Sequence, residues 1–194
     1  MKVRLGPSAN LYPMPCPLVV GGTLERAGAL PVAWIGIGSG TPPSVAMAVR
    51  GTRATLALVR ETGTFTVNVP RADDAATVDY FGLVSGRDRD KWTDSGWTLE
   101  PAAVVDAPLV AECPYALECR VTQEVEVGEY VLVVGEIVET HADESVLDPA
   151  TGKVDVALLD PLVYIPGARE YRRLGAKVAD AFSVGRMVAP EDGA

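Results

Sequence analysis

The sequence predicts a mainly β protein, a closed or nearly closed β-barrel with a few peripheral helices. The strongest evidence is "YALECRVTQEVEV", residues 115–127, in which apolar and polar residues alternate with period 2. Gly128 and Glu129 then turn the chain into a second long strand, "YVLVVGEIVETHAD". The interior Gly135 allows this hairpin to bend, as a barrel requires. We expect one face of the strand 115–127 to be buried and the other to meet solvent.

The elements before this hairpin are short and are separated by glycine or proline. We expect strands at 18–20, 32–38, 45–49 and 65–69, and helices at 54–61 and from Asp73 or Asp74 to Val84. Gly63 should end the first helix, and "RDRDKW" should form a turn or short helix. Near the end of the chain, four apolar residues recur at helical spacing and predict an amphipathic helix: Tyr171, Leu174, Val178 and Phe182.

Composition narrows both the domain organisation and the class of partner. The 19 glycines and 15 prolines are spread evenly, so we treat 1–194 as a single domain with a short arm at about 1–11 and a tail at about 188–194. A net charge of −9 argues against nucleic acid or an anionic membrane as partner. No apolar stretch is long enough to predict a signal peptide or a membrane span. We expect a soluble protein.

The reactive residue types favour an organic cofactor over side-chain catalysis. Cys16, Cys113 and Cys119 are odd in number and lack metal-binding spacing, which is typical of reduced, mostly buried cysteines in a cytoplasmic protein. The single histidine, His141, stands in a polar turn and is expected at the surface, although any Ser-His or Cys-His nucleophile would have to use it. If the protein is an enzyme, a cofactor should carry the difficult chemistry.

The segment "WIGIGSG", residues 34–40, places three glycines on one face of a strand. Gly36, Gly38 and Gly40 would leave bare backbone against which a planar ligand could lie. They could equally serve to bend a barrel strand, and both interpretations stay open. A dinucleotide fingerprint is excluded because another strand follows instead of a helix.

The segment "RGTRAT" stands where a strand turns into a helix. Arg50, Thr52, Arg53 and Thr55 surround the helix N-terminus, whose amides and partial positive charge favour a phosphate. Arginine adds charge-assisted hydrogen bonds. The alternative is a Thr52 N-cap beside solvated arginines.

A third stretch, "DYFGLVSGRDRDKW" at 79–92, offers loop amides and a cation for a ligand's oxygens. Ser85 and Gly86 supply the loop, and Lys91 supplies the charge. Lys91 could instead pair with Asp88 or Asp94 at the surface, where such a pair contributes little.

Seven segments, in order over about 10–187, resemble the flavoredoxin branch of the flavin reductase-like, FMN-binding split-barrel proteins. They are "YPMPCPLVVGG", "AWIGIGSGTPPSVAMAVRGTRAT", "TGTFTVNVP", "YFGLVSGRDRDKW", "DAPLVAEC", "EVGEYVLVVGEIVE" and "REYRRLGAKVADAFSVG". The resemblance implies a Greek-key-type split β-barrel that binds FMN non-covalently, as a homodimer with the flavin near the interface.

The same resemblance assigns roles to residues of this chain. It puts the phosphate at Arg50, Arg53 and Thr55, and Ser85, Gly86 and Lys91 match the family's loop. The isoalloxazine would lie along Ala33, Trp34, Ile35 and Gly36. In the expected dimer, Tyr164 or Tyr171 should lie near the flavin. One departure is that "AGALPVAW" lacks the asparagine and the few additional residues that usually precede the tryptophan.

The implied activity is that of an oxidoreductase whose flavin N5 accepts hydride from NAD(P)H, so that no acid–base side chain is needed. Electrons would pass to free flavin, a ferric chelate, oxygen or a protein. A non-catalytic FMN-binding electron carrier or flavin-binding module is the alternative, and a related barrel for pyridoxal phosphate or haem is a second one.

Overall fold

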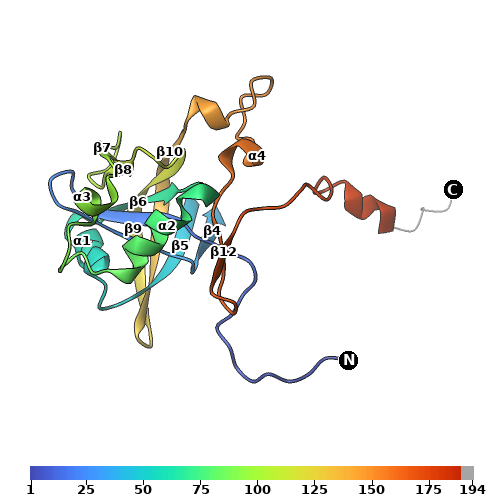
Figure 1. Ribbon diagram of the computed structural model, residues 1–194, viewed down its shortest axis with the longest axis horizontal. Helices are drawn as coiled ribbons and strands as arrows, with labels where there is room; N and C mark the ends of the chain where they lie inside the picture. Colours follow the sequence, from blue (N-terminus) through green and yellow to red (C-terminus); the bar gives the residue numbers. More distant parts are fainter. Residues whose placement is uncertain (189–194) are drawn as a thin grey trace.

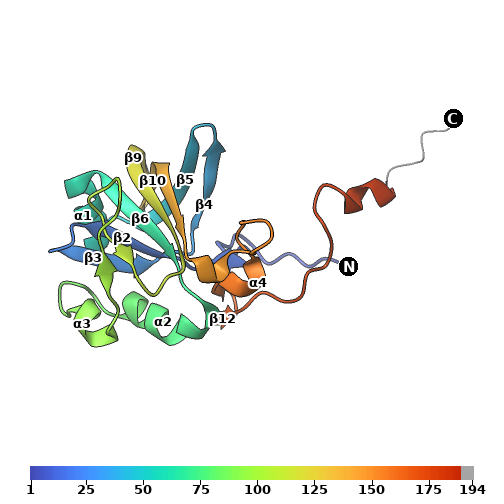
Figure 2. The same ribbon diagram turned by 90° about the horizontal axis from the view of Figure 1, so that it is seen from above.

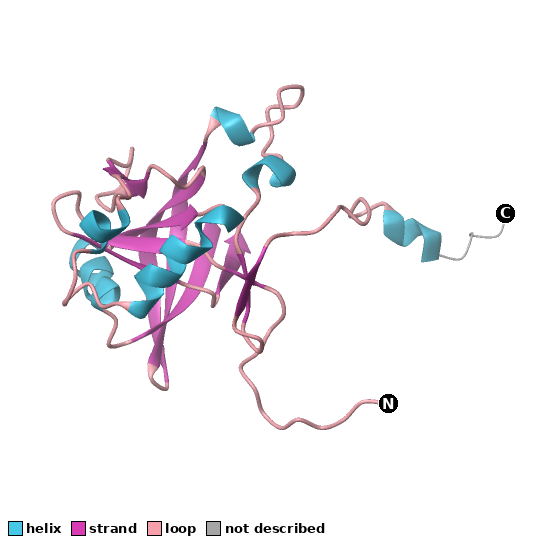
Figure 3. Cartoon of the chain, viewed as in Figure 1, coloured by secondary structure: helices cyan, strands magenta, loops and turns pink. Residues whose placement is uncertain are grey.

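The computed structural model describes residues 1–188, which form a seven-stranded antiparallel sheet curled into an incomplete barrel (Figures 1 and 3). In spatial order the strands are β3 (Ala27–Pro31), β2 (Leu18–Gly22), β6 (Thr64–Val69), β9 (Tyr115–Val127), β10 (Tyr130–Ala142), β5 (Pro43–Arg50) and β4 (Ile35–Gly40). Within the described residues, β3 and β4 are the two edges and share no ladder. The barrel is therefore split, and the mainly β prediction is confirmed.

Smaller elements surround the barrel. A second sheet has the order β1 (Met14–Pro15), β11 (Val163–Ile165) and β12 (Glu170–Arg172), and β7 (Leu99–Glu100) pairs with β8 (Leu109–Val110). The helices are α1 (Ala54–Thr62), α2 (Ala75–Leu83), α3 (Lys91–Ser95) and α4 (Val156–Leu159), with 3-10 turns at Ala72–Asp74, Glu144–Val146 and Val184–Val188. Figure 2 shows α2 and α3 on the side of the barrel opposite the β4–β5 hairpin. Between residues 1 and 188, no helix has the length and apolar character needed to cross a membrane.

Helix α1 has the bounds that its sequence predicts to within one residue. Gly63 ends it in the left-handed conformation, with φ of 68°, and its N–H donates to the Val59 carbonyl at 2.8 Å. Leu56 and Val59 are buried toward the barrel. A Cβ on Gly21 of β2 would lie 2.6 Å from a Val59 methyl, so this close approach of helix and strand requires glycine.

The barrel core is aliphatic and is centred on Phe65. Phe65 and Val133 are completely buried and Met47 nearly so. A Cβ on Gly135 would lie 2.5 Å from the Phe65 ring, and the β9–β10 register shifts at this glycine. Gly135 therefore provides both the bend that the sequence predicts and the space for the central ring.

Two boundaries of the N-terminal strands differ from the prediction. The strand expected at 32–38 is displaced to β4, and the preceding β3, which pairs with β2, was missed. The Val32 N–H bonds to the Pro17 carbonyl and so continues the β2–β3 pairing to Val32, after which the chain bends at Ala33 and Trp34 and begins a separate strand. Strand β5 begins at Pro43, which the first position of a strand tolerates.

The predicted C-terminal amphipathic helix is wrong. Tyr171 lies in β12 opposite Tyr164, while Leu174 and Val178 follow in an irregular segment, Phe182 lies in a turn, and all three are exposed. A helical pattern needs a surface on which to bury its apolar face, because isolated short helices are marginal in water. Val178 and Phe182 are almost completely exposed, so they do not pack on the body within residues 1–188. The predicted tail at 188–194 lies outside the described residues from 189 onward.

The expectation that β9 buries only one face is also wrong. Glu118, on the face assigned to solvent, is fully buried, whereas Val125 and Val127 are exposed. The Glu118 carboxylate accepts backbone N–H groups from Ala103, Val104 and Val105 at 2.7–3.0 Å and lies 2.6 Å from His141 Nε2. His141 keeps 36% of its side chain exposed, so its predicted surface position holds only in part.

Candidate functional site

A cavity of about 450 Å³ lies at the N-terminus of α1 and collects most of the predicted phosphate residues. The predicted residues that line it are Arg50, Thr52, Arg53, Thr55, Ser85, Gly86 and Lys91. They come from the end of β5, the start of α1, the loop after α2 and the start of α3. Two segments far apart in the sequence, 50–55 and 85–91, thus meet at one helix N-terminus.

The start of α1 is open to an anion. Its N-cap residue is Arg53, no side chain caps the helix, and no acidic residue stands in its first turn. Within residues 1–188, the Arg53 guanidinium has no hydrogen-bond or ion-pair partner. The Thr52 N-cap alternative is therefore wrong, and a free cation stands beside exposed helix amides.

Arg50 is held in place by the β9–β10 hairpin. Its guanidinium pairs with Glu129 at 3.1 Å and donates to the Tyr130 hydroxyl at 3.1 Å. The Tyr130 ring in turn packs against Trp34, with ring centroids 4.7 Å apart. Tyr130 therefore connects the arginine end of the cavity to the strand on which a planar ring was expected.

Lys91 is buried in the cavity wall, which excludes the surface ion pair with Asp88 or Asp94. Its ammonium donates to the carbonyls of Ala29 and Phe81 at 3.0 and 2.7 Å. Burial of this ammonium, together with the nearby Arg53 charge, lowers its pKa to about 8. Asp94 instead binds Arg89 and Tyr80. The cavity is thus cationic on two sides, at Arg53 and at Lys91.

The predicted ring residues lie outside this cavity, on β4 and just before it. Ala33, Trp34 and Ile35 line a second cavity of about 330 Å³, and Gly36 lines a third, apolar cavity of about 410 Å³ that shares Ile35. A Cβ on Gly36 would meet no atom within 4 Å, so its backbone is bare. The β4–β5 register shifts between Ile37 and Ser39, around Gly38. Both interpretations of the glycines thus find support, a bare surface at Gly36 and a bend at Gly38.

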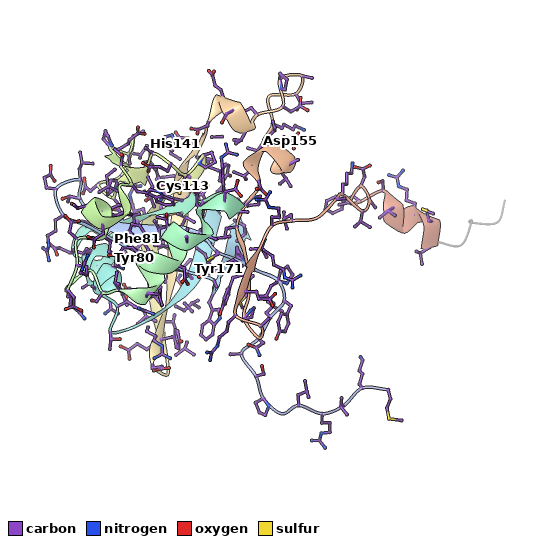
Figure 4. The ribbon with its side chains drawn as sticks, in the orientation of Figure 1. Tyr80, Phe81, Cys113, His141, Asp155 and Tyr171 are labelled. Atoms are coloured by element: carbon purple, nitrogen blue, oxygen red, sulfur yellow. The ribbon has the colours of Figure 1, made fainter. Side chains whose placement is uncertain are left out.

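Tyr164 and Tyr171 lie in the small sheet, on β11 and β12, away from the three cavities. Their rings are 5.7 Å apart across β11 and β12. Tyr171, which is labelled in Figure 4, donates its hydroxyl hydrogen to Asp79 at 2.8 Å. Burial and this hydrogen bond raise the pKa of Tyr171. They pack with Cys16 and Leu162 and line none of these three cavities. Within one chain, the structure does not bring the two tyrosines to the other predicted residues.

Two residues of this region were missed from the sequence, Tyr130 and Arg87. Arg87 lines the α1 cavity, and Tyr130 orients Arg50. The register of β10 with β5 places Tyr130 directly opposite Arg50, so a correct pairing of these strands would have identified it. Arg87 follows Ser85 and Gly86 in the same loop, and its charge was the available signal.

Comparison with known proteins identifies the family of the chain. The family model described as a flavin reductase like domain matches residues 10–175. A protein of Archaeoglobus fulgidus is 36% identical over 134 residues, which make up 69% of this chain and 75% of the relative. Flavoredoxin of Desulfovibrio vulgaris (Miyazaki F) is 35% identical with a TM-score of 0.89, over 95% of this chain and 100% of that one. Flavoredoxin from Methanosarcina acetivorans is 29% identical with a TM-score of 0.90, over 97% and 100%.

The matched region begins before β1, ends after β12, and includes every residue of the α1 cavity. The alignments with the two flavoredoxins span the full length of those chains, so the likeness extends to the whole fold. The family model matches most of the chain, and the split barrel agrees with it in fold. This chain therefore belongs to the flavin reductase-like family.

Proposed function

We propose that the protein is an FMN-binding oxidoreductase of the flavoredoxin and flavin reductase type. When bound, FMN would supply the redox chemistry, taking hydride from NAD(P)H and passing electrons to free flavin, a ferric chelate, oxygen or a protein. The chain itself would bind and orient the cofactor. The observation that carries the proposal is the α1 cavity, in which an unpaired arginine stands beside an uncapped helix N-terminus.

The donors in this cavity fit a phosphate dianion. Arg53 offers a guanidinium with no partner in the described residues, and the first amides of α1 add a partial positive charge. Lys91, at the start of α3, contributes a second cation to the same cavity. We propose that Thr52, Thr55, Ser85 and Gly86 add neutral donors. In a chain with a net charge of −9, so many cations in one cavity would seldom arise by chance.

We place the ring of the cofactor along Ala33, Trp34, Ile35 and Gly36. The support is the bare backbone at Gly36 and the Trp34–Tyr130 contact, which leads from this strand to Arg50. We further propose a cytoplasmic homodimer with the ring near the interface. Three free, buried cysteines suit a reducing compartment, and β4 is an exposed edge beside an apolar cavity.

Mixing the FMN-loaded protein with NADH or NADPH in a stopped-flow instrument tests the activity. We expect the flavin absorption in the blue to bleach on mixing with one of the two nucleotides. Flavin that dithionite reduces but neither nucleotide does would favour the electron carrier. A protein that binds no flavin but takes up haem or pyridoxal phosphate would contradict the proposal.

Substituting Gly36 with valine should impair binding of FMN without unfolding the barrel. Valine suits strands, and the space around Gly36 is open in the protein. Against a bound ring, the added methyl groups would cost about 1–3 kcal/mol, a rise in Kd of about 5- to 150-fold, measured by quenching of flavin fluorescence. Gly40→Val is the matched control, because Gly40 is also open but lies at the far end of β4. Equal affinities for both variants would mean that Gly36 only shapes the strand.

Binding of FMN should weaken as the pH rises from 7 to 9. Lys91 has a pKa of about 8, so the cavity loses a positive charge over this interval. The FMN phosphate has a second pKa of about 6 and stays a dianion there. We expect Kd to rise by up to about tenfold, the limit for the loss of one proton over this range. Lys91→Met should remove the dependence, and circular dichroism checks that it folds. A flat profile for the unmodified protein would separate Lys91 from the phosphate.

A further inference from the structure

The turn of the β9–β10 hairpin lies against the turn that leads from β5 into α1. The Gly51 N–H donates to the Glu129 carbonyl at 3.0 Å, and Tyr130, the first residue of β10, is the ladder partner of Arg50. Tyr130 and Arg50 are 80 residues apart in the sequence. The fold thus brings the aromatic residue of a distant hairpin beside an arginine of the α1 cavity.

Two contacts from this hairpin hold the Arg50 guanidinium and leave part of it free. Its Nε donates to the Tyr130 hydroxyl at 3.1 Å, and its Nη2 pairs with Glu129 at 3.1 Å. The guanidinium carbon also lies 5.4 Å from the centre of the Tyr130 ring, within the range of a cation–π contact. Within residues 1–188, Nη1 has no partner. Arg50 is therefore held in one direction and still has donors for a ligand.

Of these two contacts, the tyrosine hydroxyl is the firmer restraint. The side chains of Arg50 and Glu129 are 51% and 63% exposed, and an ion pair so exposed contributes little and holds two flexible side chains weakly. The Tyr130 hydroxyl is carried by a rigid ring, and that ring packs against Trp34. The hydroxyl is thus a fixed acceptor, whereas the Glu129 carboxylate can move with its side chain.

The ring of Tyr130 acts at the other end of the candidate site. It packs against the Trp34 indole with ring centroids 4.7 Å apart and planes tilted by 34°. The Trp34 carbonyl accepts the Ala48 N–H at 2.8 Å, which fixes the backbone of Trp34 to β5. Trp34 is itself 36% exposed, so the tyrosine ring is a main restraint on the orientation of its indole.

We propose that Tyr130 is a positioning residue for both halves of the ligand. Its hydroxyl acts on the phosphate through Arg50, and its ring acts on the planar ring system through Trp34. Tyr130 itself need not touch the ligand in either role. The inference rests on the proposed binding of FMN at the α1 cavity and along the Ala33–Gly36 segment.

The variant Tyr130→Phe removes the hydroxyl and keeps the ring. We expect its Kd for FMN to rise by about 2- to 10-fold, the range for one lost hydrogen bond, while its Kd for riboflavin stays unchanged, because riboflavin has no phosphate. Titrations followed by flavin fluorescence measure both constants. Tyr115→Phe is the matched control, because Tyr115 begins β9 at the opposite end of the same hairpin, beside Ala142; it should leave both constants unchanged.

A double-mutant cycle separates positioning from a structural role. In the Arg50→Ala protein, Tyr130→Phe should have no further effect on FMN, because the hydroxyl acts only through the arginine. A rise in Kd that persists in the Arg50→Ala protein, an equal rise for FMN and riboflavin, or no rise for either ligand would overturn the role of the hydroxyl. Circular dichroism shows whether each variant keeps the barrel.

The variant Tyr130→Leu tests the second half of the proposal. Loss of the ring frees the indole of Trp34, so Kd for riboflavin should now rise as well, by about 2- to 10-fold, as expected for a lost aromatic pair. An unchanged Kd for riboflavin in this variant would overturn the role of the ring. If the unmodified protein bound neither flavin, the proposed function would be refuted and the inference with it, a result distinct from all of these.

Discussion

Replacing Arg53 with alanine should weaken binding of FMN by about 1.5–3 kcal/mol, the usual contribution of a hydrogen bond to a charged group. Arg53 is the cation at the mouth of α1 that has no partner within residues 1–188, so a phosphate would be its main contact. Riboflavin, which lacks the phosphate, should bind the variant and the unmodified protein equally. Fluorescence titration of both ligands measures the two effects.

Two other arginines make this expectation specific. Arg60→Ala removes the same charge from the opposite end of α1, where Arg60 pairs with Glu124 at 2.7 Å, and should leave FMN affinity nearly unchanged. Arg50→Ala should weaken FMN in the same 1.5–3 kcal/mol range, toward its lower end because Arg50 already bonds to Glu129 and Tyr130. If Arg53→Ala weakened riboflavin and FMN alike, the phosphate would have to lie elsewhere.

Replacing Glu118 with alanine should lower the free energy of unfolding by about 3–5 kcal/mol. The fully buried carboxylate satisfies three backbone N–H groups of the loop 103–105 and contacts His141, and alanine leaves these donors without a partner. Urea denaturation followed by circular dichroism measures the loss. Glu126→Ala, at an exposed position of the same strand, should change stability by less than about 0.5 kcal/mol.

The same carboxylate predicts the direction of an acid-dependent loss of stability. Burial acts to raise the pKa of Glu118, but the hydrogen bonds from Ala103, His141, Val104 and Val105 outweigh it and hold the pKa below its usual value. The carboxylate therefore stabilises the fold fully above the pKa of an unfolded glutamate, about 4.3, and this contribution is lost as the pH falls through the lower folded value. Glu118→Gln should show a flatter stability profile below pH 5. An equal slope in both proteins would mean that other carboxylates control the acid transition.

Local patterns in the sequence predicted the elements that depend on near neighbours. Helix α1 has its expected position because Gly63 ends it in the left-handed conformation, and this C-cap depends only on neighbouring residues. The long hairpin formed because period-2 alternation and the turn at Gly128 specify it within one stretch of chain. The grouping of Arg50, Thr52, Arg53 and Thr55 was also local, since all four stand within six residues around one helix N-terminus.

Tertiary contacts decided the rest, and no local pattern could have done so. Lys91 reads as a surface residue in "RDRDKW", but its ammonium is buried because the carbonyls of Ala29 and Phe81, from two other elements, converge on it. Glu118 stands on the polar face of its strand, yet a loop 13–15 residues away in sequence folds over that face and supplies its amides.

The C-terminal segment is a case in which a local pattern is present but the predicted element does not form. Its helical spacing of apolar residues is present in the sequence, but spacing stabilises a helix only where a surface receives the apolar face. Within residues 1–188, Val178 and Phe182 stay exposed and pack on no such surface, and Tyr171 pairs with Tyr164 instead. The sequence by itself determined most of the barrel strands, the first helix and the cluster of polar residues at its N-terminus, because these follow from interactions over a few residues. The three-dimensional fold alone decided which polar groups are buried and where segments 1–12 and 173–188 lie, because those outcomes depend on which distant segments meet.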